Sequence, residues 1–93
     1  MDRYREVIDK YKDKDNKPSV LKVIEDILIK AGDQGASLRE IYATLEVIGF
    51  NHDNSVIRAY MNRNIVGSPR IGGHNLWYRK GIGIYISKEY YSS

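Results

Sequence analysis

The segment from Asn51 to Ser87 places the strongest constraint on the fold of this chain. Apolar residues gather on one side of a helical repeat, which predicts a helix from about Asn54 to Ile65. These apolar residues are Val56, Ile57, Tyr60, Met61 and Ile65. After a glycine-rich loop come two runs typical of β-strands, 76–79 and 84–87, with Gly81-Ile82-Gly83 between them. Glycine supplies the positive φ angles that a tight turn needs, so we expect a β-hairpin here.

Two further helices are predicted upstream of this segment. Ser19 is a good N-cap, and the apolar spacing that follows it predicts a helix from Val20 to Ala31. Ser37 and Glu40 have the spacing of a capping box, in which each side chain accepts a hydrogen bond from the other residue's backbone N–H. The next helix therefore runs from Leu38 to Ile48, and the residues before it can form one short strand.

Residues 1–17 are interpreted as an N-terminal amphipathic helix and linker. The main domain of the chain is expected to span residues 18–93. An apolar stripe at helical spacing runs along this segment: Tyr4, Val7, Ile8 and Tyr11. A short helix with one such stripe is not stable alone. It must pack on the domain or on a second copy of itself. These four residues are therefore our candidate homodimer interface, and a helix that simply covers the core is the alternative.

Composition excludes several kinds of site. The chain has no cysteine, so disulfides and thiolate metal sites are excluded. No apolar run approaches the roughly 18 residues of a membrane span, and the first residues lack the apolar segment of a signal peptide. We therefore expect a cytoplasmic protein with no membrane partner. His52 and His74 are the only histidines, and no carboxylates cluster near them, so we expect no metal, no cofactor and no catalytic residue.

Charge is distributed unevenly along the chain. The net charge is +3, yet residues 51–93 hold six basic and two acidic side chains. The excess of positive charge therefore begins where the third predicted helix begins. Such an asymmetry favours a polyanionic partner for the C-terminal half. The alternative is chance clustering on a solvated surface.

The outer side of the third predicted helix carries hydrogen-bonding groups and no carboxylate after Asp53. Asparagine and arginine can each make two hydrogen bonds to a purine edge in the major groove of DNA, and a surface that binds phosphates must avoid acidic groups. The alternative is the polar side of an ordinary surface helix. Candidate DNA-binding residues on and beside the helix are Asn51, His52, Asn54, Ser55, Arg58, Asn62 and Arg63. Those in the following loop and hairpin are Arg70, His74, Arg79 and Lys80.

Two stretches resemble a known winged-helix family. Ser37-Leu38-Arg39-Glu40-Ile41-Tyr42 resembles the opening of one of its helices, and the residues 76–86 resemble its aromatic-basic strand, Gly-x-Gly turn and closing strand. This family is shared by restriction endonucleases, chromatin proteins of the additional-sex-combs type and the delta subunit of bacterial RNA polymerase. The resemblance covers about residues 19–87 and implies DNA binding or contact with transcription machinery, without catalysis. The long loop from Gly67 to Asn75 departs from the family's pattern.

We therefore predict an α+β fold, a winged helix-turn-helix with a three-helix core, a C-terminal β-hairpin wing and an extra N-terminal helix. The predicted function is a small double-stranded DNA-binding protein, a transcriptional regulator, with the third helix in the major groove and the wing on the backbone. The alternative is a protein-binding winged-helix module. It would be an adaptor or inhibitor, of the kind found in phages, viruses and mobile elements, that contacts RNA polymerase or another host factor.

Overall fold

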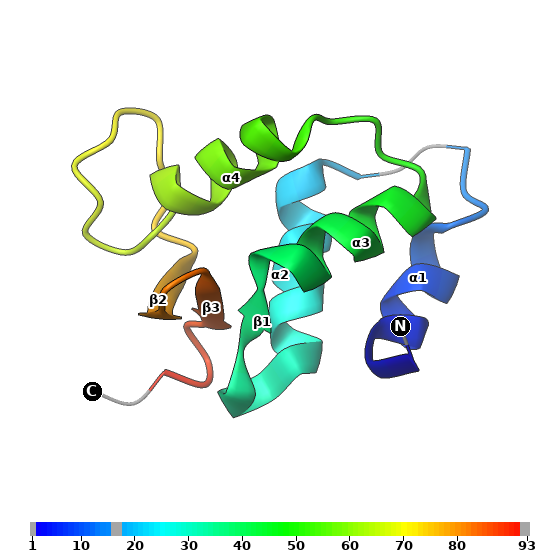
Figure 1. Cartoon of the computed structure of the whole chain (residues 1–93), viewed down its shortest axis with the longest axis horizontal. Coiled ribbons are helices and arrows are strands. Elements are labelled where there is room, and N and C mark those ends of the chain that lie inside the picture. The colour runs from blue at the N-terminus through cyan, green and yellow to red at the C-terminus, as the bar shows by residue number, and fades with distance from the viewer. Residues whose placement is uncertain (1, 16–17, 92–93) are drawn as a thin grey trace.

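The computed structural model describes residues 2–15 and 18–91 (Figure 1). Within these ranges four α-helices and a three-stranded antiparallel sheet form an α+β structure, so the predicted class is confirmed. The helices are α1 (Arg5–Tyr11), α2 (Val20–Ala31), α3 (Leu38–Ile48) and α4 (Asn54–Arg63). The strands are β1 (Ala36–Ser37), β2 (Trp77–Gly81) and β3 (Ile84–Ser87), and short 3₁₀ turns span Asp2–Tyr4 and Gly32–Gln34.

The predicted bounds of α2 and α3 are confirmed because local hydrogen bonds fix them. The Ser19 hydroxyl accepts a hydrogen bond from the backbone N–H of Lys22 (3.3 Å) and so caps α2. At α3 the Ser37 hydroxyl accepts from the N–H of Glu40 (3.1 Å), and the Glu40 carboxylate accepts from the N–H of Ser37 (3.0 Å). This is the predicted capping box. At the other end, Gly49 has a φ of 113°, a left-handed conformation that ends α3.

The sheet pairs strands that are far apart in the sequence, β1 and β3. The strand order is β1-β3-β2, with Ala36 opposite Tyr85 and Tyr78 opposite Ile86. The backbone N–H of Leu38 donates to the carbonyl of Gly83 (2.9 Å), which ties the tip of the β2–β3 hairpin to the start of α3. The short strand predicted before α3 is therefore confirmed, and its role is to anchor the hairpin.

One hydrophobic core connects all of these elements. Helix α2 contributes fully buried residues, among them Val23, Ile24 and Ile27. Trp77 on β2 is also fully buried, and its indole N–H donates to the carbonyl of Met61 on α4 (2.8 Å). A buried tryptophan needs such a partner for its N–H. This side chain therefore holds the hairpin against α4.

The N-terminal segment corrects the dimer hypothesis. Tyr4, Val7, Ile8 and Tyr11 are buried in the chain's own core, so the structure contradicts their assignment as an exposed homodimer interface. The alternative, a helix that covers the core, agrees with this burial. Helix α1 itself ends at Tyr11, within the predicted helix-and-linker segment. The last two residues of the predicted linker, 16–17, lie outside the described residues.

Polar contacts fasten the N-terminal segment to α2 and α3. The Arg3 guanidinium donates to the carbonyls of Ala31 (3.0 Å) and Gly35 (3.2 Å) and pairs with the Glu40 carboxylate (3.2 Å). The Tyr4 hydroxyl also donates to Glu40 (3.2 Å). Burial and the neighbouring Glu40 charge raise the pKa of Tyr4 to about 12, so its hydroxyl keeps its proton at neutral pH.

Acid is expected to destabilise the chain through Asp26 and Glu40. Partial burial works to raise the pKa of each carboxyl, but hydrogen bonds and nearby cations outweigh it and lower both values below their ordinary 3.8 and 4.5. A carboxyl whose pKa is lowered by folding contributes stability that is present above its unfolded pKa and is lost as the pH falls through its folded pKa. The urea midpoint of unfolding should therefore stay level from neutral pH to about pH 5 and fall below about pH 4. The fall should be smaller in a variant with Asp26→Asn and Glu40→Gln, and an equal fall in both proteins would contradict the assignment.

Candidate nucleic-acid interface

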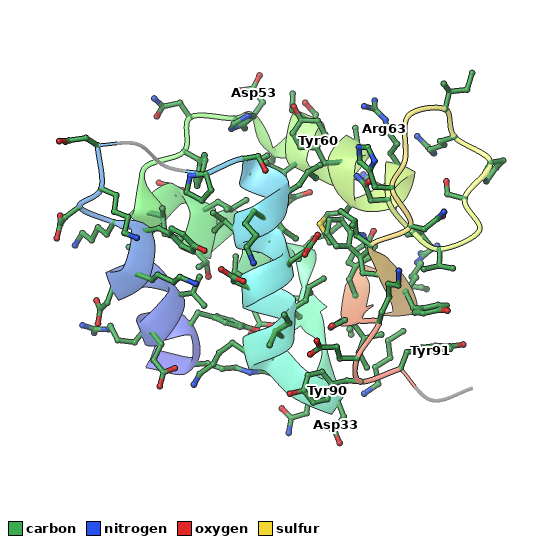
Figure 2. The ribbon with its side chains drawn as sticks, turned by 180° about the vertical axis from the view of Figure 1, so that it is seen from behind. Asp33, Asp53, Tyr60, Arg63, Tyr90 and Tyr91 are labelled. Carbon is green, nitrogen blue, oxygen red and sulfur yellow. The ribbon has the colours of Figure 1, made fainter. Side chains whose placement is uncertain are left out.

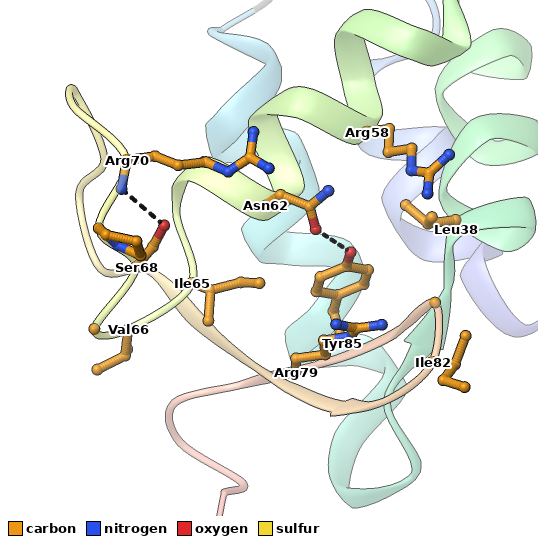
Figure 3. Close-up of a pocket in the computed structure, with 13 residues that line it drawn as sticks. Leu38, Arg58, Asn62, Ile65, Val66, Ser68, Arg70, Arg79, Ile82 and Tyr85 are labelled. Atoms are coloured by element: carbon orange, nitrogen blue, oxygen red, sulfur yellow. Dashed lines mark hydrogen bonds between the residues drawn. The ribbon is translucent and has the colours of Figure 1, made fainter.

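A groove of about 700 Å³ lies between α4 and the β2–β3 hairpin (Figure 3). Arg58 on α4, Arg70 in the loop after α4 and Arg79 on β2 all line it. Its remaining lining residues are Leu38, Asn62, Ile65, Val66, Gly67, Ser68, Pro69, Ile82, Gly83 and Tyr85, so none of the described lining residues is acidic. Three consecutive segments of the chain, α4, the loop after it and β2, therefore bring three arginines to one concave surface.

A hydrogen bond between two lining residues of this groove joins α4 to β3. The Tyr85 hydroxyl donates to the side-chain oxygen of Asn62 (2.7 Å), as Figure 3 shows. Burial raises the pKa of the Tyr85 phenol, and the nearby charges of Arg79 and Arg58 partly oppose that rise. The hydroxyl is therefore a neutral donor at physiological pH. Because this bond joins the helix to the hairpin, it fixes the distance between the two walls of the groove.

Two predicted site residues that are neighbours on β2 have different surroundings. Arg79 lines the groove, and its Nε donates to the carbonyl of Gly81 (3.2 Å). Lys80, the next residue, donates from its ammonium group to the carbonyl of Asp33 in the 3₁₀ turn after α2 (2.6 Å). Lys80 therefore braces the hairpin and does not line the groove.

The start of α4 presents its predicted residues to solvent. Asn54, Ser55 and Arg58 are all exposed, in the first turns of the helix. Val56, which we expected on the buried, apolar side of the helix, is also exposed. The helix ends at Arg63, earlier than predicted, because Ile65 forms an isolated bridge with Trp77.

Asn51 and His52 precede α4 and lie outside the groove. Together with Asn54 and Glu46 they line a separate hollow of about 180 Å³ next to α3. The His52 ring packs near the rings of Phe50 and Tyr60, with centroid distances of 5.9 and 6.0 Å. The structure thus does not bring Asn51 or His52 into the arginine groove, and a DNA-binding role for them stays a prediction.

Arg63 and His74 are associated with the base of the loop after α4. Figure 2 shows Arg63 at the C-terminal end of α4, beside that loop. A Cβ at Gly73 would lie 2.0 Å from the backbone oxygen of Arg63, so only glycine fits there. The backbone N–H of His74 is bound to the side chain of Asn64 (2.8 Å), while its ring is exposed. Neither residue lines the groove, and their contact with DNA also stays a prediction.

Sequence reasoning missed two residues that build this site. Asn64 is fully buried and organises the loop. Its side-chain amide donates to the carbonyl of Tyr60 (2.8 Å), and its backbone carbonyl accepts from the N–H of Leu76 (2.8 Å). The sequence pattern places Tyr85 in a strand and indicates no further role for it. The position of Asn64 just after a helix is typical of a capping residue. For Tyr85 no pattern in the sequence indicates a partner on α4.

The described residues contain no group of three or more His, Cys, Asp or Glu side chains placed to hold a metal ion. Within the same residues no helix combines the length and the apolar character needed to cross a membrane. Comparison with protein-family models, with curated proteins and with solved structures found no significant match. The arginine groove and the outer side of α4 are therefore the basis for a functional assignment.

Proposed function

We propose that this chain is a double-stranded DNA-binding protein with a winged helix-turn-helix fold, acting as a transcriptional regulator. In this proposal α4 enters the major groove and the β2–β3 hairpin is the wing that contacts the neighbouring backbone. The order of elements supports it, because a short strand, two helices joined by a short turn, and a β-hairpin follow α2 in the chain. Function does not follow from such an order alone. The site must supply the argument.

The observation that carries the proposal is the groove shared by Arg58, Arg70 and Arg79. Arginine presents a planar fork of donors that matches the oxygens of a phosphate. Arginines that line one groove repel each other, an anion bound among them would relieve that repulsion, and the lining residues include no carboxylate to fill that role. A nucleic-acid backbone supplies closely spaced phosphates that satisfy all three guanidinium groups.

The exposed side of α4 adds donors of a second kind. Asn54 and Ser55 lie in the first turn of the helix and face solvent. Side chains of these types reach base edges when a helix lies in the major groove. The groove would then hold the flanking backbone while α4 reads bases. In DNA-binding proteins, contacts to phosphates usually position the protein and contacts to bases specify the sequence.

Binding to duplex DNA tests the proposal. With a fluorescent duplex of random sequence, we expect tight binding at about 50 mM salt and an affinity about 100-fold lower at about 200 mM, as for roughly four phosphate contacts. A single strand of the same sequence is the control and should bind more weakly with a shallower dependence on salt. Absence of duplex binding at low salt would overturn the proposal. It would leave the protein-binding module, with RNA polymerase or another regulator as partner, as the remaining hypothesis.

A further inference from the structure

Two isoleucines project from the structure on either side of the arginine groove. Ile71 is 95% exposed and Ile82 is 92% exposed, far more than the other exposed large hydrophobic residues among those described. Loop tips of this kind usually carry polar side chains or glycine. Each isoleucine is flanked by glycine, and each follows a groove-lining arginine, Arg70 or Arg79, within three residues.

The loop that carries Ile71 is closed at its base by side-chain hydrogen bonds. The N–H of Gly67 donates to the side-chain oxygen of Asn75 (3.2 Å), which closes the loop near its base. Gly67 and Gly72 have φ values of 81° and 87°, which other residues rarely adopt. Asn64 secures the far end of the loop through His74, as described above. The chain therefore uses specific hydrogen bonds and glycines to present an apolar tip to solvent.

Hydrogen bonds also anchor the residues beside Ile82 in the hairpin. Gly83 accepts a hydrogen bond from the N–H of Leu38, and Lys80 is bound to the carbonyl of Asp33. A register shift between Arg79 and Gly81 bends the strand just before the tip. Figure 3 shows Ile82 at one end of the groove and Arg70, the neighbour of Ile71, at the other. The two tips thus lie at opposite ends of the site.

We infer that Ile71 and Ile82 are apolar wedges that enter the minor groove of the bound duplex, part base steps and bend the DNA. The inference rests on the proposed DNA-binding function. Branched apolar side chains act as wedges because they replace the stacking contact of one base with another, and the loss of stacking is offset by contact with more protein surface. Here the arginines beside each tip would hold the phosphates next to the parted step.

The chemistry of the duplex limits where such wedges can enter. Pyrimidine–purine steps such as TA and CA unstack most easily, whereas A-tracts resist bending. We therefore expect the chain to prefer duplexes that contain TA steps over A-tract duplexes of equal length. The preference would arise without any hydrogen bond to those bases.

Bend angles measured by energy transfer between dyes at the two ends of a duplex test the inference. The natural chain should shorten the end-to-end distance of a duplex with TA steps. A variant with Ile71→Ala and Ile82→Ala should bind about tenfold more weakly, keep the same salt dependence and leave the DNA nearly straight. Ile29→Ala is the control, because Ile29 is an exposed isoleucine on α2 that does not line the groove; it should bind and bend like the natural chain.

The outcomes separate the wedge from DNA binding itself. If the natural chain binds the duplex without bending it, or if the double variant bends it equally, the wedge inference is wrong and DNA binding stands. If the natural chain binds no duplex at any salt concentration, both proposals fail. Thermal unfolding of the double variant should match that of the natural chain, because both side chains are almost fully exposed; a lower transition temperature would show that the tips serve stability.

Discussion

Replacing Val7 and Ile8 with aspartate should unfold the whole chain. Each substitution removes an aliphatic side chain from the core, a loss of about 1.5–3 kcal/mol, and places a carboxylate where little water reaches, which adds several kcal/mol more. A domain of this size has roughly 5–10 kcal/mol of stability in total. The variant should therefore give the circular dichroism spectrum of an unfolded chain at 25 °C and show no cooperative transition on heating.

The control separates burial from charge. Lys12→Glu changes the net charge by the same two units, at an exposed residue just after α1, and should unfold within a few degrees of the natural chain. The contrary result would be a double variant that stays folded and becomes monomeric while the natural chain is dimeric in sedimentation. That result would restore the apolar stripe of α1 as a contact between two copies.

The fate of this stripe illustrates what periodicity can establish. The spacing of Tyr4, Val7, Ile8 and Tyr11 correctly predicted which side of α1 is apolar. Periodicity contains no information about what covers that side, because a stripe packs equally well on the same chain or on a copy. The choice was made by distant contacts, above all those of Arg3 with the end of α2 and with Glu40 on α3.

Local chemistry explains where sequence reasoning succeeded. Ser19, Ser37 and Gly49 act on backbone groups within four residues, so the bounds of α2 and α3 followed from the sequence. The hairpin was also local, because Gly83 lies at the turn between two β-type runs. These interactions involve neighbours in the chain and need no knowledge of the tertiary fold.

The site itself depended on contacts that the sequence does not reveal. Among the predicted basic residues, Arg58, Arg70 and Arg79 line the groove, and contact of any of them with DNA stays a prediction. Arg79 lines the groove whereas Lys80 contacts Asp33, and because the strand register shifts between Arg79 and Gly81, simple alternation along the strand does not determine which of the two faces α4. The bond from Tyr85 to Asn62 spans 23 residues and has no sequence pattern at all.

Charge reversal at the groove should remove DNA binding while leaving the fold intact. With Arg58→Glu and Arg79→Glu, two phosphate contacts become repulsions, and we expect the affinity for duplex DNA at low salt to fall on the order of 100-fold or more. The loss should shrink as salt rises, because added ions screen both the lost attraction and the new repulsion. Both residues are exposed, so the unfolding temperature should change little.

A matched variant tests whether the groove or the net charge is responsible. Lys12→Glu with Lys88→Glu lowers the net charge from +3 by the same four units, at exposed residues that do not line the groove. If binding depends on the groove, this variant should lose only a few-fold in affinity, through weaker long-range attraction. Equal losses in both double variants would mean that DNA responds to overall charge and that the groove is not the binding site. Unchanged affinity in the Arg58 and Arg79 variant would place the DNA contacts elsewhere on the molecule.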